Sequence, residues 1–336
     1  MKNYDEFLCR AAVWLQSYFD AHPQGPAGIR TGIRDVEKLQ GESYRGLTLS
    51  FPSSNVGASI NLHPYFDMYM KGLSLEKTLQ RLLQDILPLL DRPGWTDRPL
   101  SLAYKDCRER LMLELLPLKG NEDQLSSLPY RKIADLALIV RLDFGTAGDS
   151  RASAVVSNSL LASFGIGPEK LFADALEVAS RTIPLIIRPM AEILSEISGP
   201  VFADERIPLY VATNDRAFMG ASVLAYPEFG SQASRLLHDD FYIIPSSIHE
   251  VLLLPAGRFP AIPILPAIVK SVNREQVAPE DRLSDNVYFY SRTSGLITPA
   301  LFPEHPCHKN TACGPGPAGS PEDDADHERE DPLIIF

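Results

Sequence analysis

The sequence has few cysteines, and they are too far apart for a disulfide scaffold. Four occur in 336 residues: Cys9, Cys107, Cys307 and Cys313. Their number and spacing do not resemble the dense, paired cysteines of small secreted domains. Cys9 and Cys107 fall in stretches with helical apolar periodicity, where a cysteine usually acts as a small hydrophobe. A chain of this length can bury a sizeable core without cross-links.

Long apolar runs and clusters of basic residues are also missing. No stretch approaches the roughly 18 apolar residues of a membrane span. Residues 1–6 are acidic and form no apolar signal core. We therefore expect a cytoplasmic protein without membrane contact. No run of Lys and Arg supplies the charge that neutralises nucleic-acid phosphates, so we expect no nucleic-acid partner.

The acidic residues gather at the C-terminal end. Residues 303–336 hold eight acids against Lys309 and Arg329, which gives −6 of the total net charge of −11. Pro, Gly and Ser dominate the rest of this segment, so it cannot bury enough apolar surface to offset the entropy of ordering. We predict a disordered acidic tail, in which Leu333–Phe336 either frays or adds a strand to an exposed sheet edge.

The same tail contains two patterns that imitate ligand sites. Residues 314–319 fit Gly-x-Gly-x-x-Gly, but they follow no strand and open no helix, as a dinucleotide site requires. A metal site built from the tail's histidines and cysteines would have no surrounding groups to orient its ligands. We predict no cofactor and no metal. The tail residues concerned are His305, Cys307, His308 and Cys313.

The periodicity of apolar residues predicts the elements of the first 200 residues. A helix should begin after Asn3, with Glu6 completing a capping box, and end at His22-Pro23. Further helices should begin at Ser74 and Pro168 and span about 101–116. The predicted strands are 46–51, 56–62, 136–142 and 152–156, with hairpin residues 52–55 and loop residues 145–148 between them.

The segment from 201 to 302 is patterned mainly as strands. Strands are predicted at 209–213, 221–226, 241–244, 251–254 and 287–290, with helices starting near 229 and 263. This order favours an α+β fold, with antiparallel or mixed sheet modules and helices packed on one face. We expect four parts: a helix-rich α+β module (1–122), a middle α+β module (123–200), a β-rich module (201–302) and the tail (303–336).

Several short strings have a recognisable family character. The most specific runs from Asp240 to Glu250 (DFYIIPSSIHE), and others lie at Leu209–Asn214 with Gly220-Ala221. With these strings the chain resembles the bacterial family catalogued as domain of unknown function 5688, from residue 1 to about 295. The family has no established activity, so the resemblance implies no mechanism. The remaining matching positions are Pro129, Arg131, Asp135–Ala137, Arg141, Val272-Asn273, Val277–Glu280 and Leu283–Asp285.

The densest cluster of polar residues lies on either side of residues 241–244. A histidine there could take a proton from a serine while a carboxylate orients the ring, or the group could hold a divalent metal. Pro-Ser-Ser is also good turn chemistry, no Gly-x-Ser-x-Gly elbow is present and no zinc spacing fits, so we favour a structural turn. The cluster comprises His238, Asp239, Asp240, Ser246, Ser247, His249 and Glu250.

Two further groups carry weaker signals. Asp285 precedes a predicted strand, which makes it an Asx-type turn residue or, if the strands pair suitably, a carboxylate near His249. Arg131, Asp135 and Arg141 suggest a buried ion-pair network at a domain contact, with anion binding by the arginines as the alternative. The catalytic candidates are thus Ser246, Ser247, His249, Glu250 and Asp285.

Two functions remain open at this point. The first is a non-enzymatic binding or regulatory module that recognises a protein or peptide partner. The second is a hydrolase or metal-dependent enzyme that uses Ser246, His249 and Glu250. The first is favoured, because the chain is rich in core pattern and poor in catalytic signatures. A pocket lined by His249, a carboxylate and a hydroxyl would favour the second, and a surface with an exposed apolar patch the first.

Overall fold

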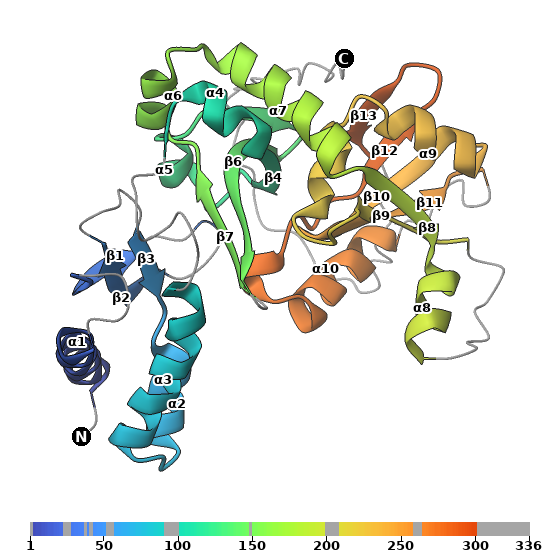
Figure 1. Ribbon diagram of the computed structural model, residues 1–336. Coiled ribbons are helices and arrows are strands. Elements are labelled where there is room, and N and C mark those ends of the chain that lie inside the picture. Colours follow the sequence, from blue (N-terminus) through green and yellow to red (C-terminus); the bar gives the residue numbers. More distant parts are fainter. Residues whose placement is uncertain are drawn as a thin grey trace, which may run out of the picture. The chain divides into compact units, whose positions relative to one another are not determined.

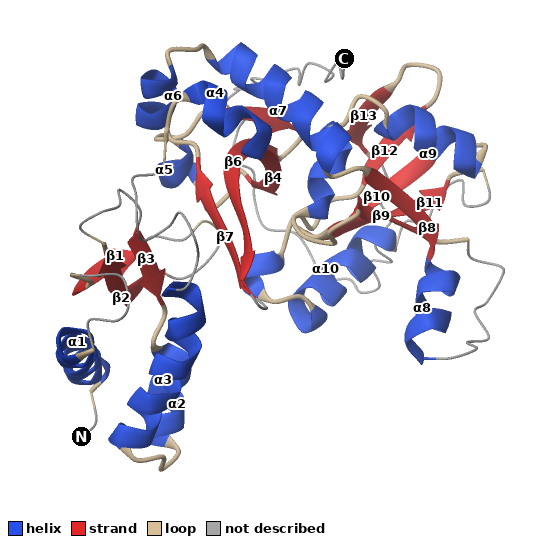
Figure 2. Ribbon diagram, viewed as in Figure 1, coloured by secondary structure: helices blue, strands red, loops and turns tan. Residues whose placement is uncertain are grey.

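The computed structural model describes residues 3–22, 28–36, 39, 43–51, 57–90, 101–147, 150–198, 208–257 and 264–300 (Figure 1). The predicted tail at 303–336 and hairpin loop at 52–55 lie outside the described residues. Within them the chain has an α+β fold with antiparallel sheets, which confirms the predicted class (Figure 2). No helix in this part of the chain is both long and apolar enough to cross a membrane.

Helices and strands are interspersed along the described residues. The helices are α1 (Tyr4–Ala21), α2 (His63–Met70), α3 (Leu75–Leu90), α4 (Tyr104–Cys107), η1 (Arg108–Arg110), α5 (Glu122–Leu125), α6 (Asn158–Phe164), α7 (Pro168–Thr182), α8 (Met190–Ser198), η2 (Gly220–Ala225), α9 (Phe229–Leu237), α10 (Leu265–Gln276) and η3 (Pro279–Asp281). The strands are β1 (Arg30–Val36), β2 (Tyr44–Ser50), β3 (Gly57–Ile60), β4 (Leu111–Pro117), β5 (Tyr130–Ile133), β6 (Leu136–Ala147), β7 (Ser150–Val155), β8 (Leu185–Pro189), β9 (Tyr210–Asn214), β10 (Phe241–Ser247), β11 (Glu250–Pro255), β12 (Tyr288–Ser291) and β13 (Leu296–Pro299).

The chain divides into two compact units, and it passes between them several times. The first unit takes residues up to 112 together with 120–129 and 140–178. The second takes 113–119, 130–139 and the residues from 179 onward. The strand order is β1-β2-β3 in one sheet, β4-β6-β5 with β7 on β6 in another, and β13-β12-β10-β11-β9-β8 in the largest.

The first helix confirms the predicted start and end, but its capping differs. The Asn3 side chain accepts a hydrogen bond from the backbone N–H of Asp5, as an N-cap does. Glu6 does not complete a capping box: its carboxylate accepts from Arg10, 2.5 Å away and one turn on. The acid is therefore used along the helix surface rather than at the helix end.

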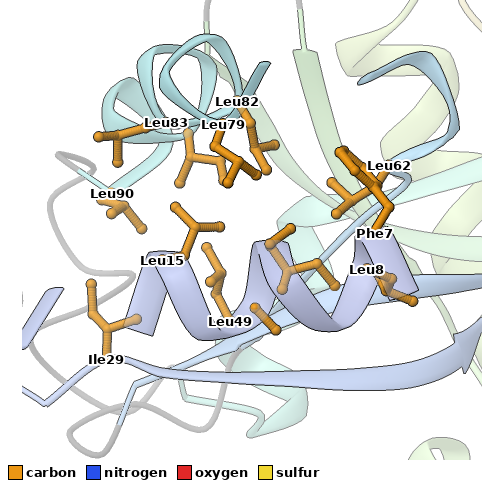
Figure 3. Packing of buried hydrophobic residues seen from close by; sticks show 14 of the residues in the cluster. Phe7, Leu8, Leu15, Ile29, Leu49, Leu62, Leu79, Leu82, Leu83 and Leu90 are labelled. Atoms are coloured by element: carbon orange, nitrogen blue, oxygen red, sulfur yellow. The ribbon is translucent and has the colours of Figure 1, made fainter. Parts of the chain in front are cut away.

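The apolar stripe of α1 forms the core of the three-stranded part of the first unit. Leu8 and Leu15 are fully buried and belong to one cluster with Leu49 of β2 and the leucines of α3 (Figure 3). A buried leucine contributes roughly 1.5–3 kcal/mol relative to an exposed one. The predicted stripe of α3 is also confirmed, because Leu79, Leu82 and Ile86 belong to the same cluster.

The predicted helix at 101–116 is wrong. A single turn, α4, and the short η1 are followed by strand β4. Residues 111–116 are all buried, so both faces of this strand are covered. A strand buried on both faces is a continuous apolar run, and such a run cannot be told from a buried helix by periodicity alone. Cys107, at the end of α4, is buried as expected, whereas Cys9 is exposed.

The six-stranded sheet of the second unit carries helices on both faces rather than on one. Neighbouring residues of a strand point to opposite faces, and Phe241 and Tyr242 of β10 show this. Phe229 of α9 meets Phe241 edge-on, with 6.2 Å between the ring centroids. Leu265 of α10 belongs to the cluster around Tyr242. In Figure 1, α9 and α10 lie accordingly on either side of β10.

Two other predictions in this sheet are corrected. Residues 221–226 form no strand; η2 replaces it, and the left-handed backbone of Met219 (φ 52°) turns the chain just before it. The expected turn at Pro245-Ser246-Ser247 lies inside β10, where the register with β11 shifts between Ile244 and Ser247. A bulge thus absorbs the proline, which cannot donate a ladder hydrogen bond.

Candidate functional site

The polar cluster that the sequence brings together is divided by strand β10. Residues 238–240 precede the strand, whereas Ser247 closes it and His249 follows. Six residue steps at about 3.3 Å place its two ends about 20 Å apart. The seven polar residues therefore belong to two separate groups and do not form one site.

The first group holds the chain at the start of β10. Asp239 accepts from the backbone N–H of Gly257 at 2.6 Å, and Asp240 from that of Arg292 at 2.9 Å. The guanidinium of Arg292 donates to the carbonyl of His238, which has a left-handed backbone. These bonds join the ends of β10, β11 and β12 and leave the two carboxylates engaged with the backbone.

The second group is centred on the His249 ring. Its Nδ1 accepts from the backbone N–H of Met219 at 3.1 Å, and its Nε2 lies 3.4 Å from the carboxylate of Asp281. An Nδ1 that accepts a hydrogen bond carries no hydrogen, so the ring hydrogen sits on Nε2 and faces Asp281. Ser247 Oγ accepts from the His249 N–H at 3.1 Å, as a turn serine does.

The remaining catalytic candidates have other places in the second unit. Asp285 accepts from the Asn273 amide at 3.0 Å, and the carboxylate found 3.4 Å from His249 is that of Asp281. Glu250 opens β11 opposite Ser247, and Ser246 lies within β10. Among the described residues, no group of three or more His, Cys, Asp or Glu side chains is placed to hold a metal ion.

A different carboxylate, that of Asp135, accepts hydrogen bonds from residues that are far from it in the sequence. It occupies the second position of the two-residue turn between β5 and β6. Its Oδ2 accepts from Ser284 Oγ at 2.8 Å and from Asn286 Nδ2 at 3.0 Å, and its Oδ1 from the Tyr288 hydroxyl at 2.5 Å. All three donors are neutral, which corrects the expected ion-pair network for this residue. Arg141 donates to Ser153.

Buried neighbours fix the donors that face Asp135. Burial, and then the nearby Asp135, raise the pKa of Tyr288, so the phenol keeps the hydrogen that it donates. Asn273 is 3% exposed and donates to the carbonyl of Ser284 at 2.8 Å. These contacts hold the segment from Ser284 to Tyr288 in the position that the carboxylate needs.

Asp135 lines a cleft of about 440 Å³ in the second unit. This volume is in the range of pockets that bind a small molecule or a few residues of a peptide. Its walls are mostly apolar, with four polar side chains among them. The polar residues are Lys119, Lys132, Asp135 and Asn286, and the others are Leu118, Ala134, Pro266, Val287, Pro299 and Ala300.

Part of this site had a signal in the sequence. Asp135, Asn273 and Leu283–Asp285 all stood among the strings that resemble a family, but nothing in the strings indicated that they meet. Tyr288 lies 153 residues from Asp135. Lys119 and Lys132 gave no signal, because single exposed lysines occur on every soluble surface.

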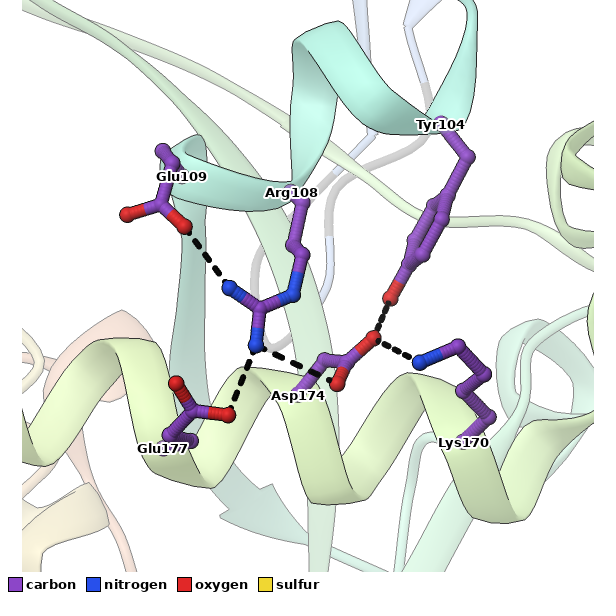
Figure 4. A network of polar contacts seen from close by, with 6 residues as sticks. All are labelled: Tyr104, Arg108, Glu109, Lys170, Asp174 and Glu177. Atoms are coloured by element: carbon purple, nitrogen blue, oxygen red, sulfur yellow. Dashed lines mark hydrogen bonds and ion pairs between the residues drawn. The ribbon is translucent and has the colours of Figure 1, made fainter.

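A second polar network lies in the first unit and joins α4 and η1 to α7 (Figure 4). The Asp174 carboxylate accepts from the Tyr104 hydroxyl, from Lys170 at 2.8 Å and from Arg108 at 3.4 Å. Burial acts to raise the pKa of Asp174, but these hydrogen bonds outweigh it and hold the pKa below its ordinary value. Arg108 also binds Glu177 and Glu109. Every group shown is paired within the network, which indicates a role in packing.

The comparisons with known proteins give a family and no activity. The model of a family of unknown function, DUF5688, matches residues 4–292. No curated protein and no solved structure matches the chain.

Proposed function

The chain belongs to the family of unknown function DUF5688, and from the geometry of the site we propose that it is a non-catalytic binding module for a protein or peptide partner. The observation that carries the proposal is the cleft beside Asp135. Apolar walls with a few oriented polar groups are the usual composition of a recognition site.

The fixed orientation of Asp135 supports recognition. Three hydrogen bonds from neutral donors hold the carboxylate, so little conformational freedom is lost when a ligand binds beside it. Pro299 ends β13 and Ala300 follows it, and both residues line the cleft. Among the described strands, β13 lies at an edge of the six-stranded sheet. An extended peptide could therefore reach both the cleft and the outer edge of β13, which pairs with no further strand among the described residues.

The polar residues near β10 also favour binding over catalysis. A general base needs a ring nitrogen that is open to the proton it removes. In His249, Nδ1 accepts a backbone hydrogen bond and Nε2 faces Asp281, while Ser247 Oγ serves the backbone. These groups stabilise turns, and the cleft lining contains neither His249 nor Ser247.

The test is a selection of peptides from a random displayed library on the immobilised protein. We expect sequences that bind the native chain and lose at least about tenfold in affinity, or about 1.4 kcal/mol, to the variant Ala300→Trp, whose indole fills the cleft. Fluorescence anisotropy with a labelled peptide measures the affinities.

The matched control is Ala191→Trp, which adds the same indole at an exposed position of α8 outside the cleft. It should bind the selected peptides like the native chain. Peptides that bind Ala300→Trp and the native chain equally well would place recognition elsewhere and refute the proposal.

A further inference from the structure

Two lysines give the cleft a positive charge that the described residues do not neutralise. Lys119 follows β4 and Lys132 lies in β5, and both side chains line the cleft. Both residues are exposed, and neither ammonium group has a partner among the residues that the structure describes. An unpaired ammonium at the rim of a low-dielectric cleft attracts anionic groups over several ångströms.

The carboxylate in the same cleft does not cancel this charge. Asp135 contributes one negative charge against the two ammonium groups, and that charge is shared among three hydrogen bonds. The remaining lining residues carry no formal charge. The cleft therefore favours an occupant with carboxylates that reach the two lysines and an apolar part that covers the proline and alanine wall.

The same chain contains a segment of this chemistry close in sequence to the cleft. Residues 322–331 hold seven acids against one arginine, and Leu333–Phe336 follow them. Ala300, the last residue of the cleft wall, is 22 positions before Glu322. For a segment of this length, random-coil statistics give an end-to-end distance of about 26 Å. A tether of this kind gives an effective concentration in the millimolar range.

We propose that the acidic segment Glu322–Asp331 occupies the cleft of its own chain, pairs with Lys119 and Lys132, and competes there with an acidic partner peptide. The inference rests on the proposed function of the cleft and adds its regulation. Because the segment and the cleft belong to one chain, their contact lowers the apparent affinity of the cleft for a partner. A partner must then exceed the tethered segment in affinity or in concentration.

Zero-length carbodiimide cross-linking of the full chain tests the contact. The reagent joins a lysine amine to a carboxylate in direct contact, and mass spectrometry of the monomer identifies the joined peptides. We expect Lys119 or Lys132 to be joined to residues 322–331 at low salt. The yield should fall at least fivefold at about 1 M salt, where the Debye length is about 3 Å.

Charge reversal supplies the specificity control. Lys119→Glu with Lys132→Glu should remove the cross-links to the tail from this region. Lys71→Glu with Lys77→Glu changes the net charge equally at exposed positions of the first unit, and it should leave the cross-links intact. Cross-links spread evenly over all exposed lysines, or present in both variants alike, would overturn the inference.

A binding experiment separates failure of this inference from failure of the proposed function. A full chain whose eight tail acids are replaced by Gln or Asn should bind a selected acidic peptide at least tenfold more tightly than the native chain does. Equal binding to both chains, still abolished by Ala300→Trp, would reject the tail as occupant and keep the cleft as a peptide site. Binding that Ala300→Trp leaves unchanged in both chains would reject the proposed function itself.

Discussion

The hydroxyl of Tyr288 donates to the carboxylate of Asp135 across 153 positions of the sequence, with 2.5 Å between the oxygens. Tyr288 begins β12 and is 1% exposed, whereas Asp135 sits in the turn between β5 and β6. This bond joins two hairpins, β5–β6 and β12–β13, at the edge of one cleft. A buried tyrosine therefore holds the carboxylate that lines the cleft.

Asp135→Asn should destabilise the protein by about 2 kcal/mol. The asparagine amide is uncharged, and its NH2 group, itself a donor, would face at least one of the three groups that donate to the carboxylate. Tyr288→Phe removes the bond to Asp135 and should cost about 1 kcal/mol. Urea unfolding with an unchanged slope measures both values. An Asp135→Asn protein within about 0.5 kcal/mol of the native one would contradict this role, since surface substitutions typically fall in that range.

Gly220→Ala should cost about 2 kcal/mol or more through overpacking. A Cβ at this position would lie 2.0 Å from Thr213 Oγ1 and 2.3 Å from the carbonyl oxygen of His249. Gly167 is the comparison, since nothing lies within 4 Å of its added Cβ. Thermal unfolding of Gly167→Ala should show a fraction of the loss; equal losses for both variants would rule out the steric argument.

His249→Ala should destabilise the protein by about 1–2 kcal/mol, because the buried N–H of Met219 loses its acceptor. In His249→Asn the amide oxygen can accept in place of Nδ1, and part of the loss should be recovered. Urea unfolding compares the three proteins. If the Ala and Asn variants unfold together at the native midpoint, the ring has no structural role.

Acid should weaken the contact between α4 and α7 through Asp174. Its folded pKa is below the ordinary value, so its contribution to stability is fully present above about pH 3.9, the ordinary Asp pKa, and is lost as pH falls through the lowered pKa. Asp174→Asn should be less stable than the native chain at neutral pH, and the gap should close below about pH 4. Unfolding curves across this pH range measure the gap; a gap that stays constant would exclude the linkage.

The elements that the sequence predicts well are those whose periodicity has one physical cause. The first helix and α3 each bury one stripe, so their apolar spacing is unambiguous. The order of strands and helices predicted the α+β class, which the antiparallel sheets confirm, and the match over residues 4–292 confirms the family resemblance. Edge strands such as β1 and β8 were missed, because they have no fully buried residue and therefore show no clear alternation.

The errors arise where tertiary contacts override local preference. Strand β4 was predicted as helix because both of its faces are buried, and η2 was predicted as strand because its residues are mostly apolar. The polar cluster near β10 appeared dense only because sequence distance ignores the rise along a strand. The Asp135 cleft required knowledge of which hairpins meet, and a single sequence carries no such pairing information.

The turn that presents Asp135 has a consequence for protein engineering. It has only two residues, Ala134 and Asp135, and Ala134 already holds a left-handed backbone (φ 52°) that a non-glycine residue adopts at a cost. One extra residue would shift every later side chain of β6 to the other face. Labels, tags and circular permutation should therefore avoid this turn. Ala134→Gly is the substitution that should relieve its backbone strain.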